Sequence, residues 1–241
     1  DRISSFISCN CPACGSKQYS LWAIKGGFTY TKCQQCETIF MNPRADEHTL
    51  SEFYRQSKNY EFWNKYIFPA TNEIRKEKIF KPRAEKIINL CKKNEITGGT
   101  IMEVGAAFGT FCETIRELNF FNRIIAVEPT PDLANTCRQK NIETIENNIE
   151  KVILPNDSVD VVVSFEVLEH LGQPATFIAS ASKYLRPGGL IICTCPNGQG
   201  LEMLALQENA SVVDHEHINY FNPNSIRSEE HTSELQSHHP I

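Results

Sequence analysis

The stretch I-M-E-V-G-A-A-F-G at residues 101–109 decides the fold class of this chain. An apolar, strand-like run leads into small residues, and a second apolar run at residues 123–127 ends in Glu128. Short apolar strands that alternate with helices predict a parallel sheet covered by crossover helices. Small residues after the first strand let a ligand lie against the backbone. A carboxylate after the second strand can accept hydrogen bonds from both hydroxyls of a ribose.

The same alternation continues beyond residue 128 and predicts an α/β, Rossmann-like doubly wound sheet. We expect strands at residues 100–104, 123–127, 142–145, 159–165 and 189–195, and helices at about 109–119, 131–140 and 174–185. The dinucleotide fingerprint G-x-G-x-x-G does not match, because the glycine that follows Gly105 comes only at Gly109. A nicotinamide oxidoreductase is therefore the least favoured enzyme class.

Cysteine is concentrated at the start of the chain, where half of the ten cysteines lie in the first 36 residues. Two C-x2-C pairs are separated by eighteen residues: Cys11, Cys14, Cys33 and Cys36. This spacing is typical of a four-thiolate zinc site. The stretches at residues 19–24 and 28–32 flank Gly26-Gly27 and predict a hairpin, so the element is predicted to be a zinc ribbon. A disulfide pairing is the alternative, and Cys9 could compete as a ligand.

The segment between the ribbon and the first strand of the sheet is predicted to be mostly helical. A helix is expected at about residues 46–56, and the aromatic-rich residues 60–68 should end at Pro69. Residues 72–94 are predicted to be helical, with a break or a new first turn at Pro82. This stretch is net basic, which indicates a solvated helix face or, alternatively, a patch for RNA phosphates.

Composition excludes several broad classes of protein. The 241 residues include 24 Lys and Arg against 29 Asp and Glu, a net charge of −5 that argues against a protein built mainly to coat nucleic acid. The longest apolar runs fall far short of the ~20 residues that a membrane span needs. No secretory signal pattern is present, so we expect a cytoplasmic protein. The sequence predicts no oligomeric state.

The loop at residues 101–109 resembles the E/D-x-G-x-G-x-G loop of class I S-adenosylmethionine-dependent methyltransferases. Its four marked positions are Glu103, Gly105, Ala107 and Gly109, with Ala107 in place of the central glycine. Three further segments are similar to this family: residues 160–170, L-R-P-G-G-L at residues 185–190, and Pro196-Asn197. The resemblance covers about residues 100–222. The ribbon ahead of it is similar to an arrangement seen in bacterial small-molecule and sugar-modifying methyltransferases.

The resemblance implies a strand order of 3-2-1-4-5-7-6, of which five strands are visible. The closing antiparallel pair would follow residue 226, but R-S-E-E-H-T-S-E-L-Q-S at residues 227–237 resembles a translated sequencing adapter. We therefore expect a truncated sheet and an artefactual tail. The predicted organisation is a zinc ribbon at residues 1–45, a helical linker or lid at 46–98, a cofactor-binding methyltransferase domain at 99–226 and the tail at 227–241.

The family resemblance also implies cofactor contacts. Glu128 would bind the ribose, and Gly105–Gly109, including Ala107, would lie along the methionine portion. Glu103 is also expected among the cofactor-binding residues. Asn148 and Ile149 would lie near the adenine. Phe165 and Glu166 would line the far side of the pocket.

Glu166, Glu169 and His170 form an E-x-x-E-H cluster whose members share one face if the stretch is helical. Similar clusters bind a divalent ion in ubiquinone-pathway O-methyltransferases and in small-RNA 2′-O-methyltransferases. The segment D-H-E-H at residues 214–217 offers a further histidine that could complete the cluster. Mg²⁺ or Mn²⁺ there would lower the pKa of an acceptor hydroxyl. The alternatives are His170 or His217 as a general base, or a histidine that only makes hydrogen bonds.

The resemblance predicts methyl transfer to a hydroxyl, amine or carbon of a small molecule or glycan, with a nucleic-acid acceptor less favoured. An RNA methyltransferase, gripping RNA with the ribbon and the basic helix, is the second hypothesis. A non-catalytic zinc-ribbon interaction module with a degenerate cofactor domain is the third.

Overall fold

The computed structural model describes residues 6–55 and 61–226. The predicted tail at residues 227–241 lies outside the described residues. The chain divides into two compact units that are each discontinuous in sequence. Within the described residues, the first unit contains residues 6–51, 165–179 and 193–226, and the second contains the remainder. The predicted domain boundaries at residues 45, 98 and 226 stay a prediction.

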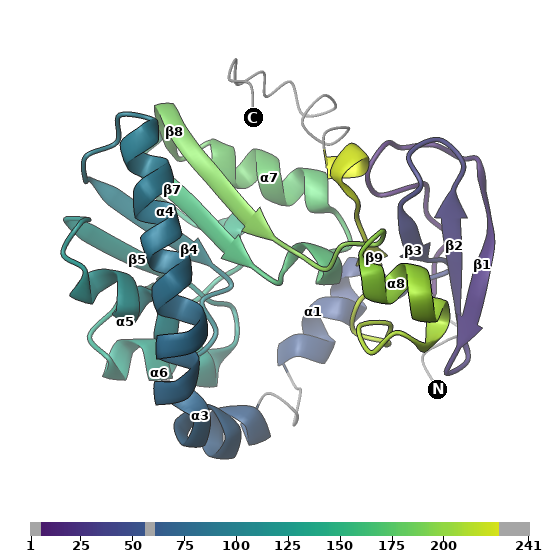
Figure 1. Cartoon of the computed structure of the whole chain (residues 1–241), viewed down its shortest axis with the longest axis horizontal. Coiled ribbons are helices and arrows are strands. Elements are labelled where there is room, and N and C mark those ends of the chain that lie inside the picture. The colour runs from purple at the N-terminus through teal and green to yellow at the C-terminus, as the bar shows by residue number, and fades with distance from the viewer. Residues whose placement is uncertain (1–5, 56–60, 227–241) are drawn as a thin grey trace. The chain divides into compact units, whose positions relative to one another are not determined.

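The core of the second unit is a five-stranded sheet (Figure 1). Its strands are β4 (Thr100–Val104), β5 (Arg123–Val127), β6 (Glu143–Ile145), β7 (Val159–Phe165) and β8 (Leu185–Thr194). Their order along the sheet is β6-β5-β4-β7-β8, which confirms the predicted 3-2-1-4-5 arrangement. The pairs β4–β5, β4–β7 and β5–β6 are parallel, and the central strands β4 and β7 are buried along almost their whole length. This burial explains why both strands are mainly apolar in the sequence.

One strand begins earlier than expected. Strand β8 starts at Leu185 rather than at residue 189, so the P-G-G segment lies within its range. Arg186 Nε donates to the Asp160 carboxylate of β7, and the Val159 amide donates to the Tyr184 carbonyl at 2.9 Å. These contacts extend the pairing of β7 and β8 toward their starts.

Three helices follow the strands close to their predicted positions: α5 (Thr110–Glu117), α6 (Pro131–Gln139) and α7 (Pro174–Ser182). Upstream, the helix α1 (Glu47–Arg55) lies near its predicted range. The π-helical turn η2 (Trp63–Ile67), α3 (Phe68–Arg75), the π-helical turn η3 (Lys76–Phe80) and α4 (Lys81–Lys93) then succeed one another directly.

The predicted break at Pro69 is wrong, because helical backbone runs through this position. At Pro82 the structure has the new first turn that was one of the two predicted alternatives. Each proline sits in the first turn of an α-helix, and a π-helical turn precedes that helix. A proline lacks the N–H that would bond four residues back, and its ring crowds the carbonyl there. The wider π-helical turn shifts the hydrogen bonding just before the proline, so the chain keeps its helical course.

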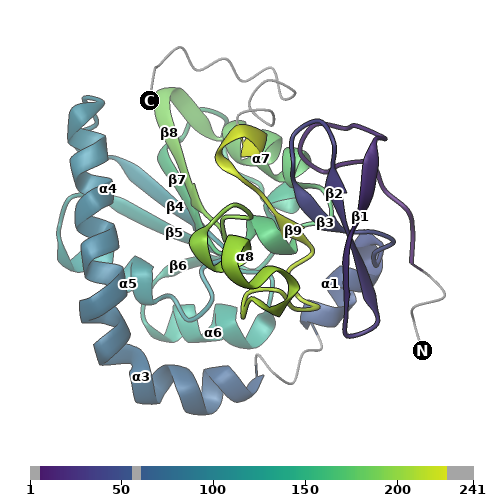
Figure 2. The same cartoon turned by 45° about the vertical axis from the view of Figure 1, so that its right-hand side comes forward.

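The first unit contains a four-stranded antiparallel sheet in the order β1-β2-β3-β9. The strands are β1 (Tyr19–Lys25), β2 (Phe28–Cys33), β3 (Ile39–Met41) and β9 (Asn219–Tyr220). Strands β1 and β2 form the predicted hairpin, with both glycines of its turn at positive φ. The fourth strand was not predicted: β9 lies beside β3, with Ile39 opposite Tyr220 (Figure 2).

The first unit also contains several short helical elements. They are α8 (Leu201–Leu206) and the 3-10 turns η5 (Leu168–His170) and η6 (Gln207–Asn209); a further 3-10 turn, η4 (Ile149–Lys151), belongs to the second unit. Among the described residues, no helix combines the length and the apolar character needed to cross a membrane.

Candidate functional site

The loop between β4 and α5 has an unusual backbone. Gly105, Ala107 and Gly109 have φ values of 79°, 48° and 70°, all in the left-handed region. Glycine adopts this region without steric cost, whereas a residue with a Cβ pays about 1–2 kcal/mol there. Ala107, the one departure from the family pattern, is therefore the strained member of the loop.

Gly109 is required by packing as well as by its backbone angle. A Cβ at this position would lie 2.9 Å from Cys137 Sγ and 2.9 Å from Ile142 Cδ1. The missing side chain lets the start of α5 approach α6 and the chain that leads into β6. The glycine therefore sets how closely the first helix packs beside the sheet.

The loop is tied to the end of β5 through Glu128. One carboxylate oxygen of Glu128 accepts the Ala107 N–H at 2.8 Å, and the other accepts the Thr130 N–H at 2.9 Å. The side chain is buried, and this burial raises the pKa of Glu128, while the two backbone donors partly offset the effect. Each carboxylate oxygen has a second lone pair, so the group can still accept two hydroxyl donors. This donor requirement matches the two hydroxyls of a ribose.

Glu103 is a second buried acid beside this loop. The Cys112 thiol donates to its carboxylate at 2.9 Å, and burial raises the pKa of Glu103 to about 8. Glu103 lies on β4 and Cys112 on α5, so the contact joins the strand and the helix on the two sides of the loop.

The remaining predicted contacts of this unit follow β6. Asn148 precedes η4, and Ile149 is buried. Two contacts that sequence reasoning missed join α3 to the loop and to α5. The Phe68 ring lies 5.2 Å from the Phe108 ring, and Thr110 Oγ1 donates to Asn72 Oδ1 at 3.0 Å. The aromatic richness of residues 60–68 was the available signal, but it did not specify which partner they contact.

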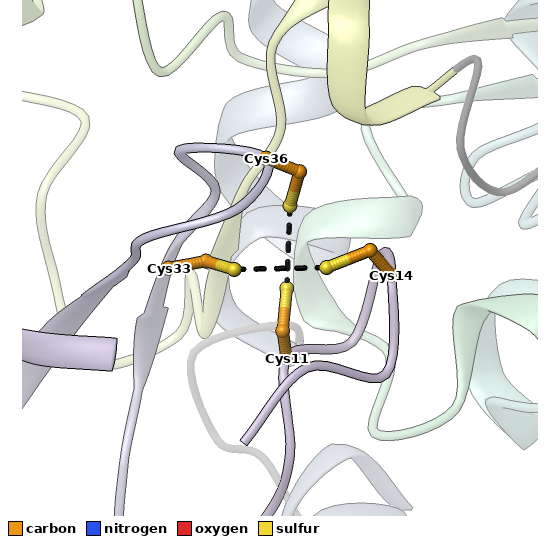
Figure 3. A group of neighbouring side chains, drawn as sticks. All are labelled: Cys11, Cys14, Cys33 and Cys36. Carbon is orange, nitrogen blue, oxygen red and sulfur yellow. Dashed lines mark hydrogen bonds between the residues drawn. The ribbon is translucent and has the colours of Figure 1, made fainter. Parts of the chain in front are cut away.

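The four predicted zinc ligands come together in the first unit (Figure 3). Their sulfur atoms all lie within 4.8 Å of one another, with Cys11 and Cys36 at 3.5 Å and Cys14 and Cys33 at 3.6 Å. Four thiolates around a tetrahedral Zn²⁺, each at 2.3 Å, would lie about 3.8 Å apart. The chemistry and spacing of the donors therefore suit zinc. Cys9 is not part of this group; its amide donates to Asn42 Oδ1 instead.

A second group of metal-type donors lies in the first unit: Glu169, His170 and His217. Their ligand atoms lie within 4.8 Å of one another, and the two imidazole rings are 4.8 Å apart. Glu169 is fully buried, and neither of its carboxylate oxygens has a hydrogen-bond partner among the described residues. Burial raises the pKa of Glu169 to about 8.

Both histidines turn the same ring nitrogen toward the backbone. His170 Nδ1 lies 2.9 Å from the Glu216 carbonyl, and His217 Nδ1 lies 2.7 Å from the Val212 carbonyl. A carbonyl can only accept, so each Nδ1 carries the proton and each Nε2 offers its lone pair. Imidazoles that bind a metal through one ring nitrogen commonly donate the other N–H to a backbone carbonyl in this way. Burial lowers the pKa of His170 to about 4, which keeps this ring neutral.

Glu166 is not part of this donor group, and the expectation that it shares a helical face with Glu169 and His170 is wrong. Its φ is 55°, and the 3-10 turn begins only at Leu168. Its carboxylate accepts the Thr194 hydroxyl at 2.7 Å. Phe165, predicted with Glu166 as a cofactor contact, is the half-buried last residue of β7.

The basic helical segment is partly neutralised within the second unit. Lys76 pairs with Glu117 at 2.5 Å, and Lys81 pairs with Glu77 at 3.4 Å. The Arg75 guanidinium lies 5.0 Å from the Phe68 ring centre. These contacts favour a solvated helix face over a patch for RNA phosphates.

Comparison with known proteins gives related chains. A "Probable S-adenosylmethionine-dependent methyltransferase" of Mycobacterium tuberculosis is 40% identical over 103 residues, which are 42% of this chain and 37% of that one. A "Ubiquinone biosynthesis O-methyltransferase" of Colwellia psychrerythraea is 25% identical over 169 residues, 64% of this chain and 68% of that one. This chain spans less than half the length of the first curated relatives that it matches.

A solved structure shares the fold. It is a "SAM-dependent methyltransferase, possible histamine N-methyltransferase" from Thermotoga maritima, with a TM-score of 0.53 at 17% identity, and the match covers 75% of this chain and 78% of that one. The family profile described as "Methyltransferase domain" matches residues 73–237, well over half of the chain. With the Rossmann-like sheet and its glycine loop, this match shows that the chain belongs to the methyltransferase domain family.

Proposed function

We propose that this protein binds S-adenosylmethionine at residues 103–109 and Glu128 and transfers its methyl group to an oxygen of a small molecule or glycan. The observation that carries the proposal is the Glu128 carboxylate, which two backbone N–H groups hold at the end of β5. The held carboxylate presents its remaining lone pairs in a fixed direction. The bound cofactor supplies an already activated methyl group, so alignment is the main task of the protein.

Oxygen as the acceptor atom is favoured by the second donor group. We infer that Glu169, His170 and His217 hold a divalent ion, which would lower the pKa of an acceptor hydroxyl. A buried carboxylate without donors among the described residues, and two imidazoles whose Nδ1 atoms face backbone carbonyls, support this assignment. Two nitrogen ligands and one oxygen suit Mn²⁺, Fe²⁺ or Zn²⁺ better than Mg²⁺, which prefers oxygen ligands. The relative named as an O-methyltransferase agrees with an oxygen acceptor.

Calorimetry with S-adenosylmethionine tests the cofactor site. Glu128→Ala should weaken binding at least about 100-fold, because two hydrogen bonds to a charged acceptor contribute about 1.5–3 kcal/mol each. Glu85→Ala, at an exposed position on α4, is the matched control and should bind as the wild type does. Circular dichroism would show whether both variants are folded. A folded wild-type protein with no affinity for S-adenosylmethionine would contradict the proposal and favour a non-catalytic module.

A screen of methyl acceptors, with S-adenosylhomocysteine release as the readout, tests the reaction. Hydroxyl acceptors should be methylated, and the activity should fall after chelation and return with Mn²⁺. Zinc content measured before and after chelation controls for loss of the ribbon metal. Activity that survives chelation but not His217→Ala would instead indicate a general base. Turnover of RNA with steep salt dependence would replace the small-molecule assignment.

A further inference from the structure

The sheet that carries the zinc ribbon is completed by the segment that carries His217. Strand β9 begins two residues after His217 and pairs with β3, and the Met41 amide donates to the Ile218 carbonyl at 2.9 Å. Asn222 Nδ2 donates to the carbonyl of Cys36, a predicted zinc ligand, at 2.9 Å. The ribbon and the His217 segment therefore form one hydrogen-bonded structure.

Two buried tyrosines of this sheet fix the turn in front of His217. Tyr30 Oη, from β2, donates to the Asp214 carbonyl at 2.5 Å, and Tyr220 Oη, from β9, donates to the Val212 carbonyl at 3.1 Å. The same Val212 carbonyl accepts the hydrogen bond from His217 Nδ1. One phenol thus holds the acceptor that orients the imidazole, and the other holds the turn beside it.

Asp214 also holds the backbone of His217 in place through its side chain. Its Oδ1 accepts the Glu216 amide at 2.8 Å and the His217 amide at 2.9 Å. The Asp214 carbonyl is tied to Tyr30, so the main chain and the side chain of the same residue link β2 to His217. No part of this chain of contacts passes through Glu169 or His170.

The Glu169 side of the donor group is anchored to the same sheet. The Ile218 amide donates to the Glu169 carbonyl at 2.8 Å, and Asn219 Nδ2 donates to the Leu171 carbonyl at 2.8 Å. The buried Arg44 follows β3 and donates from Nη1 to Asn219 Oδ1 at 2.9 Å. Hydrogen bonds to the antiparallel sheet therefore hold both the Glu169 segment and the His217 segment of the donor group.

We propose that Tyr30 is a positioning residue for His217, and that through it the zinc ribbon sets the geometry of the Glu169–His170–His217 group. This inference rests on the proposed role of that group as a divalent metal site. The ribbon then has a function beyond its own stability: it acts as the support of a second, chemically different metal site. Partners outside the ligand shell typically change metal affinity or activity by 10–100-fold.

The test uses the full chain with zinc in the ribbon and compares Tyr30→Phe with Tyr19→Phe. Tyr19 lies on β1 of the same sheet and contacts Phe40 through its ring, so its variant is the matched control. The readouts are Co²⁺ affinity from the visible absorption of the bound ion, S-adenosylmethionine affinity by calorimetry, zinc content, and kcat and KM separately.

We expect Tyr30→Phe to retain zinc and to bind S-adenosylmethionine within about twofold of the wild type, while its Co²⁺ affinity and kcat fall about 10-fold or more. Tyr19→Phe should change none of these values. Equal Co²⁺ affinity and spectra in Tyr30→Phe and the wild type would overturn the inference. A wild type that binds S-adenosylmethionine but no Co²⁺ would overturn it too, together with the metal assignment, and would leave the cofactor site intact. Loss of S-adenosylmethionine binding in the wild type would be the separate failure of the proposed function.

Asp214→Ala provides a second route to the same answer, because Asp214 is only half-buried and its loss should be tolerated by the fold. If Tyr30 acts through the turn at Asp214, the double variant should lose no more Co²⁺ affinity than the more affected single variant. Additive losses would show that Tyr30 acts by another path and would contradict the proposal.

Discussion

Glu128 and Glu169 are both buried carboxylates that come after strands of the parallel sheet, and they differ in what surrounds them. The Glu128 carboxylate accepts two backbone N–H groups, whereas the Glu169 carboxylate accepts no hydrogen bond from the described residues. A buried polar group without partners is costly, while one held by the backbone is already oriented. The first environment suits the uncharged hydroxyl donors of a ligand, and the second suits a cation. Two chemically identical side chains thus support different roles because of their neighbours.

The largest expected effect is the pH dependence of stability that Glu103 causes. This buried acid is intermediate between Glu128 and Glu169, because its carboxylate has one donor, the Cys112 thiol. Burial raises the pKa of Glu103 to about 8, above its ordinary value of 4.5. Between these values the folded protein holds a proton that the unfolded chain has released. The free energy of unfolding should therefore fall as pH rises, by up to about 1.4 kcal/mol per unit and by about 3.5 kcal/mol from pH 5 to pH 8. Urea denaturation across this range measures the slope.

Glu103→Gln is the comparison for that experiment, because its side chain does not titrate. The slope of the wild type minus that of the variant isolates Glu103 from the other buried acids. Parallel slopes in the two proteins would show that Glu103 is ionised in the folded state.

The next largest effect tests whether Glu169 is matched to a cation. Glu169→Gln keeps the size of the side chain and removes the charge that would hold the ion. Since outer partners alone change affinity 10–100-fold, losing a ligand should weaken Mn²⁺ binding by at least about 100-fold. Calorimetry with Mn²⁺ measures this, and Glu208→Gln on η6 serves as the control. Unchanged Mn²⁺ affinity in Glu169→Gln would remove Glu169 from the site.

The predictability of these features from the sequence differs between the two units. Strands β4, β5 and β7 were placed to the residue, because each is a buried apolar run bounded by breaks in the pattern. Strand β9 has only two residues, too few for an alternating pattern, and its partner β3 lies far away in the sequence. One role of Glu128 was predicted from the sequence, namely binding of the ribose. Its hydrogen bond from the Ala107 amide was not predicted, because it depends on the left-handed backbone of the loop.

The donor group shows the same division. The E-x-x-E-H spacing singled out Glu169 and His170, and D-H-E-H singled out His217. Assuming a helix placed Glu166 with them, whereas a positive φ at this residue and a short 3-10 turn separate it. Backbone conformation at a single residue was therefore the missing information, and no periodicity in the sequence encodes it.

A third, smaller effect concerns the loop that supplies the donor to Glu128. Gly109→Ala should lower the free energy of unfolding by about 2 kcal/mol, from left-handed strain and from crowding against Cys137 and Ile142. Thermal and urea unfolding measure this change. Gly172→Ala is the matched control, since its Cβ would make an ordinary 3.5 Å contact with Leu50. Equal stability of the two variants would contradict the tight packing of the loop.

The smallest effect is expected for Ala107→Gly, which restores the glycine of the family pattern. Relief of left-handed strain should be offset by the greater freedom of glycine in the unfolded chain, so stability should change by less than about 1 kcal/mol. Affinity for S-adenosylmethionine, measured by calorimetry, should stay equal or rise. A large loss of affinity would mean that the Ala107 methyl contacts the ligand. The Glu128 carboxylate would then not be the main group of this loop region that holds the ligand.

The pairing of β3 with β9 also has a consequence for the order of folding during synthesis. Ile39 lies opposite Tyr220, so the sheet closes across almost the whole described length of the chain. On the ribosome, the cysteine-bearing hairpin is made early and can capture its ion, whereas its last strand emerges only after the entire parallel sheet has been translated. Contacts of such long sequence separation form slowly, and domains generally fold as they are made. The ribbon should therefore bind its metal first and keep the edge of β3 unpaired until the segment bearing His217 and β9 has been synthesised.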